Sequence, residues 1–211
     1  MGNNLFLASK SPRRLQLLVD SGFDVTVIAS HAHTLRAFEG DEVPLHGEAP
    51  ETYALRIART KFFEGLSQRA THYPTSQDVP VLAADTVVSE DEIIFGKPAN
   101  AHEAHAFLRA LSGKTHYVRT AVVVGTNELD FTSTVQTSAV TFRKITEDEI
   151  AAYIATDEPY DKAGGYGIQG VGGIFISHLE GSYTGVMGLP IFEAAQLLSQ
   201  FGCTPYMQKK A

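Results

Sequence analysis

The chain has 211 residues, of which 44% are hydrophobic and 19% charged, and its formal net charge is −7. This apolar content can supply the core of one large α/β domain or of two small lobes, and it argues against a disordered chain. The acidic balance argues against wholesale nucleic-acid binding, which needs a basic face, but it leaves a metal-assisted phosphate site open.

The sequence carries no feature of a secreted or membrane-anchored protein. Cys203 is the only cysteine, so an intrachain disulfide is excluded, which fits a reducing compartment. No stretch approaches the roughly 20 apolar residues that span a bilayer, and the first residues lack the basic and apolar parts of a signal peptide. We therefore expect a cytoplasmic protein with no membrane partner.

In chain order, hydrophobic periodicity and capping residues predict alternating strands and helices. Ser11 and Pro12 fit the N-cap and first position of a helix that Gly22 closes, and Thr146 with Glu149 forms a capping-box pattern. The predicted strands are 5–8, 25–28, 79–88, 93–95, 117–124, 131–142 and 174–176, and the predicted helices are 12–22, 51–68, 101–111, 147–154 and 189–201.

The order of these elements mixes βα units with β-hairpins. Such a mixture indicates an α/β fold with a mixed sheet and flanking helices. No internal repeat and no long flexible linker divides the chain. We therefore expect a single domain over residues 1–211, built as two lobes that share one core.

Two arginines lie where a helix disfavours them. Arg13 and Arg14 fall in the first turn of the predicted helix, where the macrodipole favours anions. An anion docked there would explain them, because free N–H groups and guanidinium forks bind phosphate, and Ser9 and Ser11 add hydroxyl donors. The alternative is a pair of solvated surface arginines.

One carboxylate interrupts an apolar run. Asp85 falls inside 79–88, a segment that should be buried, and an ionised carboxylate there is costly unless it is paired or bound to metal. A functional role is one interpretation. A strand-end turn or a structural hydrogen bond are the others.

Two glycine-containing segments are also candidates. Lys97 follows a short predicted strand in a tight turn, and the segment 158–170 is dense in glycine, which permits close approach of the backbone to a ligand. The amide of Gln169 both donates and accepts, so it can read a base edge. Ordinary turns remain the alternative for both segments.

Three further charged residues complete the candidate set. The neighbouring carboxylates Asp41 and Glu42 suit a hard cation such as Mg²⁺, which takes oxygen ligands together with substrate phosphates. Lys61, on the helix predicted for 51–68, adds a cation. For each of the three taken alone, a solvated surface residue is the more common interpretation.

Seven segments spread over nearly the whole chain form a recognisable series: LASKSPRR (7–14), GEAP through RIARTK (47–61), ADTVV (84–88), GKP (96–98), LSGKTH (111–116), EPYDKAGGYGIQG (158–170) and GSY through VMGLP (181–190). Together, and in this order, they resemble the Maf family of nucleotide pyrophosphatases. Each motif alone is modest, whereas seven in order are highly specific.

The resemblance implies a fold, a reaction and partners. The fold would be a mixed twisted sheet with flanking helices, in two lobes around a deep cleft, of the Maf/inosine triphosphatase type, often as a homodimer. The reaction would be hydrolysis of a nucleoside triphosphate to the monophosphate and pyrophosphate with a divalent cation, Mg²⁺ or Mn²⁺. Asp85 falls at the family's catalytic aspartate, and Arg13, Thr86 and Gln169 resemble the specificity positions of the dTTP/UTP branch.

The residues fit this implied reaction in a simple way. Metal held by Asp85 with Asp41 or Glu42 would neutralise developing charge, and Asp85 would deprotonate the attacking water. The predicted ligands of the triphosphate are Ser9, Arg13, Arg14, Lys61 and Lys97.

Two other functions remain open. A non-catalytic, nucleotide-binding regulator of cell division would bind without turnover. A purine-directed housekeeping pyrophosphatase would differ in its substrate, and Thr86 and Gln169 argue against it by resemblance alone.

Overall fold

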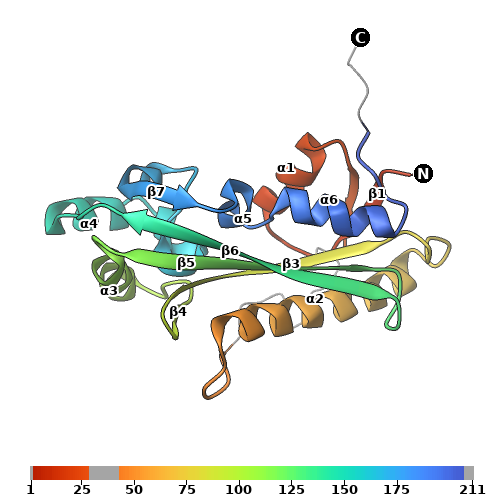
Figure 1. Cartoon of the computed structure of the whole chain (residues 1–211), viewed down its shortest axis with the longest axis horizontal. Coiled ribbons are helices and arrows are strands. Elements are labelled where there is room, and N and C mark those ends of the chain that lie inside the picture. Colours follow the sequence, from red (N-terminus) through yellow and green to blue (C-terminus); the bar gives the residue numbers. More distant parts are fainter. Residues whose placement is uncertain (1, 29–42, 207–211) are drawn as a thin grey trace, which may run out of the picture.

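The structure is a computed structural model that describes residues 2–28 and 43–206. Its strands, labelled in Figure 1, are β1 (Asn4–Leu7), β2 (Asp24–Val27), β3 (Val81–Glu90), β4 (Ile93–Phe95), β5 (Thr115–Gly125), β6 (Phe131–Phe142) and β7 (Ile176–Glu180). Its α-helices are α1 (Pro12–Asp20), α2 (Pro50–His72), α3 (Ala101–Leu111), α4 (Glu147–Ile154), α5 (Tyr183–Met187) and α6 (Ile191–Gln200). Three 3-10 helices, η3 (Glu158–Asp161), η4 (Ala163–Gly165) and η5 (Val171–Phe175), follow α4.

The strands form one mixed, seven-stranded sheet. Its order is β2-β1-β3-β5-β6-β7, and β4 pairs with β3 beside this path. β1 is parallel to β2 and β3, whereas β3, β5, β6 and β7 pair antiparallel. The predicted mixed α/β sheet with flanking helices is therefore confirmed.

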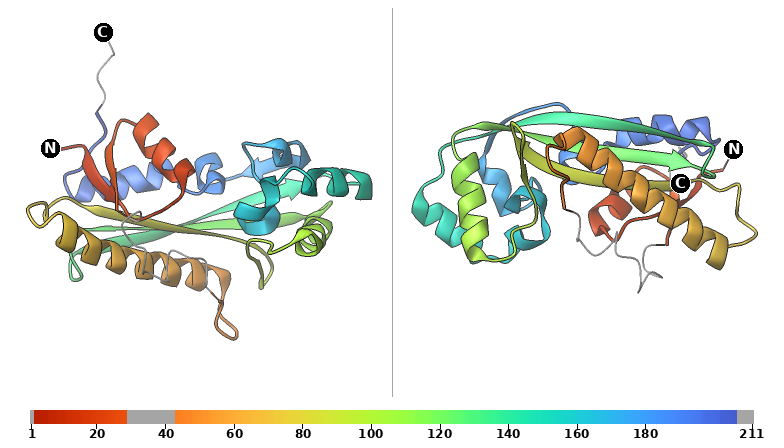
Figure 2. Two further views of the ribbon diagram at one scale, coloured as in Figure 1. Left: turned by 180° about the vertical axis from the view of Figure 1, so that it is seen from behind. Right: turned by 90° about the horizontal axis from the view of Figure 1, so that it is seen from below.

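Helices cover both faces of the sheet at the end nearer β1. Helix α2 runs along one face, and α1 and α6 cover the other (Figure 1 and Figure 2). The period of two in β3 divides its side chains between these layers. Val81 and Ala83 pack toward α2, whereas Leu82 and Ala84 pack toward α1 and α6. Because β3 is buried on both faces, its sequence is almost continuously apolar.

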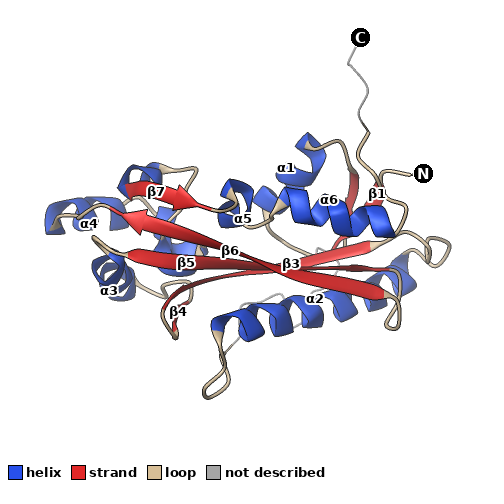
Figure 3. Cartoon of the chain, viewed as in Figure 1, coloured by secondary structure: helices blue, strands red, loops and turns tan. Residues whose placement is uncertain are grey.

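The long strands continue into a second packed region. Beyond the span of α2, they are covered by α3, α4 and the 3-10 segments (Figure 3). A third hydrophobic cluster fills this end, and its largest members include Phe142, Tyr166 and Phe175. β3, β5 and β6 thus connect two helical regions, and the space between those regions lies over the middle of β3.

Three local predictions were wrong. The strand predicted for 174–176 begins too early, because Ile174 and Phe175 end η5 and β7 starts at Ile176, where pairing with Phe142 of β6 begins. Helix α2 extends to His72, four residues beyond the predicted end. Helix α5 was not predicted, because five residues show no helical periodicity, although Ser182 caps it by accepting from the Gly185 N–H.

No helix in the described ranges combines the length and the apolar character that crossing a bilayer requires.

Candidate active site

A cleft of about 840 Å³ opens between the two helical regions. One wall is the start of α1, the floor is the middle of β3, and the opposite wall is the segment from η3 to the start of η5. All the predicted site residues in the described part of the chain line this cleft: Ser9, Arg13, Arg14, Lys61, Asp85, Thr86, Lys97 and Gln169. The predicted metal ligands Asp41 and Glu42 lie outside the described residues.

The floor holds a buried ion pair. Asp85 follows Val81 and Ala83 on the α2 face of β3, and Lys61 lies in the buried stripe of α2. Lys61 Nζ donates to Asp85 Oδ1 at 2.7 Å, and the side chains are 11% and 10% exposed. Burying these charges is costly unless they are paired. The pair thus presents a carboxylate and an ammonium together at the base of the cleft.

Thr86, the next residue, points to the other face of β3. Its hydroxyl lies 3.1 Å from Arg14 Nη2 and 2.9 Å from the hydroxyl of Thr120 on β5. Arg14 also donates through Nε to the Gly188 carbonyl at 2.7 Å and through Nη1 to Ser9 Oγ at 3.1 Å. The guanidinium therefore joins α1, β3 and the end of α5. Sequence reasoning treated Arg14 only as a phosphate ligand and missed this link.

The start of α1 forms the first wall. Ser11 caps the helix by accepting from the Arg14 N–H, and Ser9 Oγ in turn accepts from the Ser11 N–H at 3.2 Å. Arg13 Nη1 reaches across the cleft to Asp161 Oδ2 at 3.3 Å. Its side chain is 33% exposed, so this cation remains within reach of a ligand in the cleft.

The opposite wall is irregular backbone that carries Gln169. The Glu158 carboxylate lies beneath it and accepts from the Val171 N–H, the Gly172 N–H and the Tyr153 hydroxyl. Burial opposes the charge on Glu158, but the N–H groups of Gly172 and Val171 and the Tyr153 hydroxyl hold its pKa below the ordinary value. Gln169 is exposed toward the cleft, as is Lys97 after β4.

A buried histidine supports the same wall from below. His116 on β5 is fully buried, and its Nε2 lies 2.7 Å from the hydroxyl of Tyr166, which lines the cleft. Burial lowers the pKa of His116 to about 4 and raises that of Tyr166. His116 is therefore neutral at pH 7, and its role is to hold Tyr166 in place.

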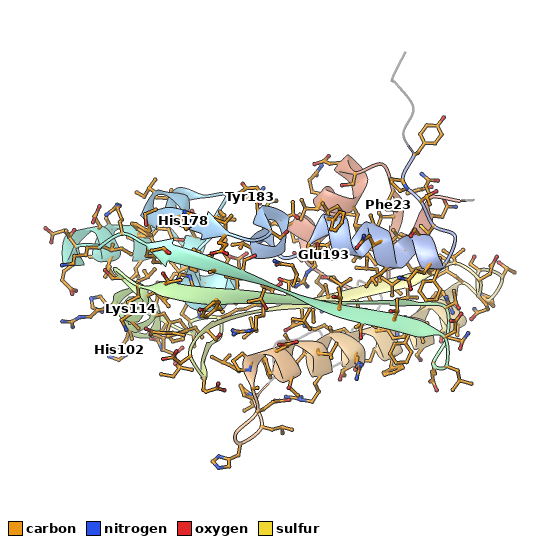
Figure 4. All side chains as sticks on the ribbon, viewed as in Figure 1. Phe23, His102, Lys114, His178, Tyr183 and Glu193 are labelled. Atoms are coloured by element: carbon orange, nitrogen blue, oxygen red, sulfur yellow. The ribbon has the colours of Figure 1, made fainter. Side chains whose placement is uncertain are left out.

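Two other histidines lie at the outer surface of the molecule. Figure 4 shows His102 on α3 and His178 on β7 at the outer surface. Within residues 2–28 and 43–206, no group of three or more histidine, cysteine or acidic side chains is arranged to hold a metal ion.

Comparison with known proteins identifies the family. The model of the family described as Maf-like protein matches residues 4–201. This chain belongs to the Maf family. It is 45% identical to a "dTTP/UTP pyrophosphatase" of Dechloromonas aromatica, over 95% of this chain and 98% of the relative. A protein of the same name from Pasteurella multocida is 46% identical, with 93% and 95% covered.

Two further matches complete the comparison of this Maf protein. A "Nucleoside triphosphate pyrophosphatase" of Haemophilus ducreyi is 46% identical over 95% of this chain and 96% of the relative. Among solved structures, a nucleoside-triphosphatase / dITP/XTP pyrophosphatase from Mycobacterium abscessus aligns over 96% of this chain and 98% of that chain. Its identity is 16% and its TM-score 0.40.

Proposed function

We propose that this Maf protein hydrolyses the pyrimidine nucleoside triphosphates dTTP and UTP to the monophosphate and pyrophosphate. The observation that carries the proposal is the buried Lys61–Asp85 pair at the base of a cleft whose rim bears Arg13 and Lys97. A triphosphate needs cations around its charge, and its hydrolysis needs a carboxylate near the reacting phosphorus. Relatives at 40–46% identity carry the name dTTP/UTP pyrophosphatase, which supports the same substrate class.

Asp85 is the proposed general base. Its carboxylate takes a proton from a water molecule whose oxygen attacks the α-phosphorus, and the bond from that phosphorus to the bridging oxygen breaks, releasing pyrophosphate. The second proton of the water stays on the monophosphate product. Lys61 holds the carboxylate at 2.7 Å and adds positive charge beside the developing negative charge.

The phosphate contacts are assigned to residues with groups directed at the cleft. Ser9, Arg13, Lys61 and Lys97 supply a hydroxyl and three cations on three sides of it. Arg14 contributes mainly by holding Ser9 and Thr86 in place, because three of its N–H groups already donate to protein oxygens.

A divalent cation, Mg²⁺ or Mn²⁺, is part of the proposal. Asp85 offers the oxygen chemistry that such ions prefer, and Mg²⁺ is usually held by one or two carboxylates together with substrate phosphates. Asp85 would hold it with Asp41 or Glu42, and the cation would neutralise charge on the triphosphate. We expect chelation with EDTA to abolish turnover and added Mg²⁺ or Mn²⁺ to restore it.

Three residues are proposed to select the base and sugar: Arg13, Thr86 and Gln169. Gln169 is exposed on the irregular wall, where its amide can pair with a thymine or uracil edge. Arg13 lines the opposite wall of the cleft, and Thr86 lines its floor.

Pyrophosphate release, measured with Mg²⁺ across the common nucleoside triphosphates, tests the proposal. We expect monophosphate and pyrophosphate from dTTP and UTP, with little from purine nucleotides. Nucleotide binding without turnover would contradict it in favour of a regulator of cell division, and preferred hydrolysis of purine nucleotides would indicate a housekeeping pyrophosphatase.

The remaining proposals concern assembly and location. We expect a homodimer in the cytoplasm whose partner is the nucleotide and not nucleic acid. Light scattering of the purified protein should give twice the mass of one chain, 22.9 kDa. A monomeric mass at micromolar concentration would contradict the dimer.

A further inference from the structure

We infer that Glu158 is a positioning residue that sets the substrate selectivity of the cleft by holding the backbone on which Gln169 stands. The inference rests on the proposed function, because selectivity is assigned there to Gln169. Glu158 itself does not touch the substrate in this scheme. It acts through the wall that it supports.

The first argument is the hydrogen bonding around the carboxylate. Val171 N–H donates to Glu158 Oε2 at 2.8 Å, and Gly172 N–H donates to Oε1 at 3.1 Å. The Tyr153 hydroxyl of α4 donates to Oε1 at 2.9 Å. Hydrogen bonds to a charged acceptor are about twice as strong as neutral ones. The carboxylate therefore anchors the chain two and three residues after Gln169.

The second argument is the absence of side chains where the wall meets Glu158. A Cβ on Gly170 would collide with the carbon and both oxygens of the Glu158 carboxylate. A Cβ on Gly172 would lie 2.7 Å from the Tyr153 hydroxyl oxygen. The glycines allow the backbone to lie directly on the charged group, which is a closer fit than an ordinary turn requires.

The third argument concerns the stretch between Tyr166 and Phe175, two residues that are themselves buried in the third core cluster. Gly170 N–H bonds to the Gly167 carbonyl at 3.4 Å, and Gly173 N–H bonds to the Gly170 carbonyl at 3.1 Å. These are bonds within the segment. They shape the turns, but they do not attach Gln169 to the body of the protein. Tyr153 belongs to the third core cluster, so the contact through Glu158 adds an attachment between the anchors at Tyr166 and Phe175, close to Gln169.

Lys162 holds the backbone of Glu158 in place. Its Nζ donates to the Glu158 carbonyl at 2.7 Å and pairs with the Asp161 carboxylate. Asp161 in turn pairs with Arg13 across the cleft. The turn that carries Glu158 is thus tied to both sides of the cleft, so the position of the carboxylate is well determined.

A double-mutant cycle tests the inference. The variants are Glu158→Gln, Gln169→Ala and the two combined, with Glu128→Gln, an exposed glutamate in the β5–β6 turn, as the matched control. The main readout is the ratio of kcat/KM for dTTP to that for dGTP. We expect Glu158→Gln to lower this ratio several-fold through a higher KM for dTTP, because small misplacements of a binding group are costly.

The cycle separates positioning from a general structural effect. If Glu158 acts through Gln169, Glu158→Gln has no further effect on the ratio in the Gln169→Ala protein. Equal losses in both backgrounds, or an unchanged ratio, would overturn the inference. Gly170→Ala provides a second route, since its methyl group displaces the wall while Glu158 remains intact, and it should shift the ratio in the same direction.

Amide hydrogen exchange supplies a readout that needs no turnover. The Val171 and Gly172 amides should exchange faster in Glu158→Gln and unchanged in Glu128→Gln, and equal exchange in all proteins would overturn the inference. If the unaltered protein hydrolyses no nucleotide, the proposed function fails separately. The cycle is then measured as affinity for an α,β-imido analogue of dTTP, and an equal effect of Glu158→Gln in both backgrounds would overturn the positioning role as well.

Discussion

The two walls of the cleft are built in different ways. The α1 wall is a regular strand–helix unit, in which Ser11 caps the helix and Arg14 joins it to β3 and to the end of α5. The opposite wall is a series of short 3-10 turns, whose position depends on side-chain acceptors such as Glu158. The comparison shows that regular secondary structure holds Arg13 and Arg14 in place on the first wall, whereas single side-chain acceptors hold the backbone that carries Gln169 on the other.

The floor between the walls should give the largest effect. Asp85→Asn removes the proposed base, and we expect turnover to fall at least about 100-fold. The protein should also lose about 3 kcal/mol of stability, because Lys61 remains buried without its countercharge. Steady-state pyrophosphate release measures the turnover, and urea unfolding measures the stability. Asp148→Asn, a substitution at an exposed residue of α4, is the control. Near-normal turnover in Asp85→Asn would show that Asp85 is not the general base.

The α1 wall can be probed by comparing its two arginines. Arg14→Lys keeps the charge but loses the fork that reaches Gly188, Ser9 and Thr86, so we expect about 2 kcal/mol less stability together with slower turnover. Arg13→Lys should mainly raise KM, because Arg13 pairs with one exposed carboxylate, that of Asp161, within the described part of the chain. Thermal unfolding and KM measurements distinguish them, and equal stability losses would contradict the difference in role.

The irregular wall should weaken first in acid. The folded-state pKa of His116 is lowered to about 4 by burial, so its neutral form stabilises the fold fully above the unfolded value of about 6.5. This stability is lost as pH falls from there toward 4, with a slope of up to ~1.4 kcal/mol per pH unit. Urea unfolding between pH 7 and 4 measures the slope. His116→Gln should flatten it, and an unchanged slope would assign the acid sensitivity to other groups.

The smallest effect is expected from the residue that the irregular wall presents. Gln169→Glu replaces an amide that donates and accepts with a carboxylate that only accepts, so the preference for dTTP and UTP should weaken several-fold with little change in stability. Competition assays with mixed nucleotides provide the measurement. An unchanged substrate profile would make Gln169 structural and would remove the functional contrast between the walls.

Much of the fold was predictable because its signals are local. The capping box at Thr146 and Glu149 is formed as the pattern predicts, and the apolar run of β3 and the helix at 101–111 are present. The start of β7 and the short helix α5 were missed. The first depends on pairing with Phe142, and the second has too few residues to show a periodicity.

The sequence by itself determined which features are unfavourable for folding and therefore candidates for function. They are the cations at a helix start, a carboxylate in an apolar strand and a glycine-dense segment. Only the tertiary structure decided how they combine. Period-two geometry directs Asp85 to Lys61 on one face of β3 and Thr86 to Arg14 on the other. These partners are 24 and 72 residues apart in the chain. Local propensity cannot bring such distant residues together, so the packing of the sheet against the helices does.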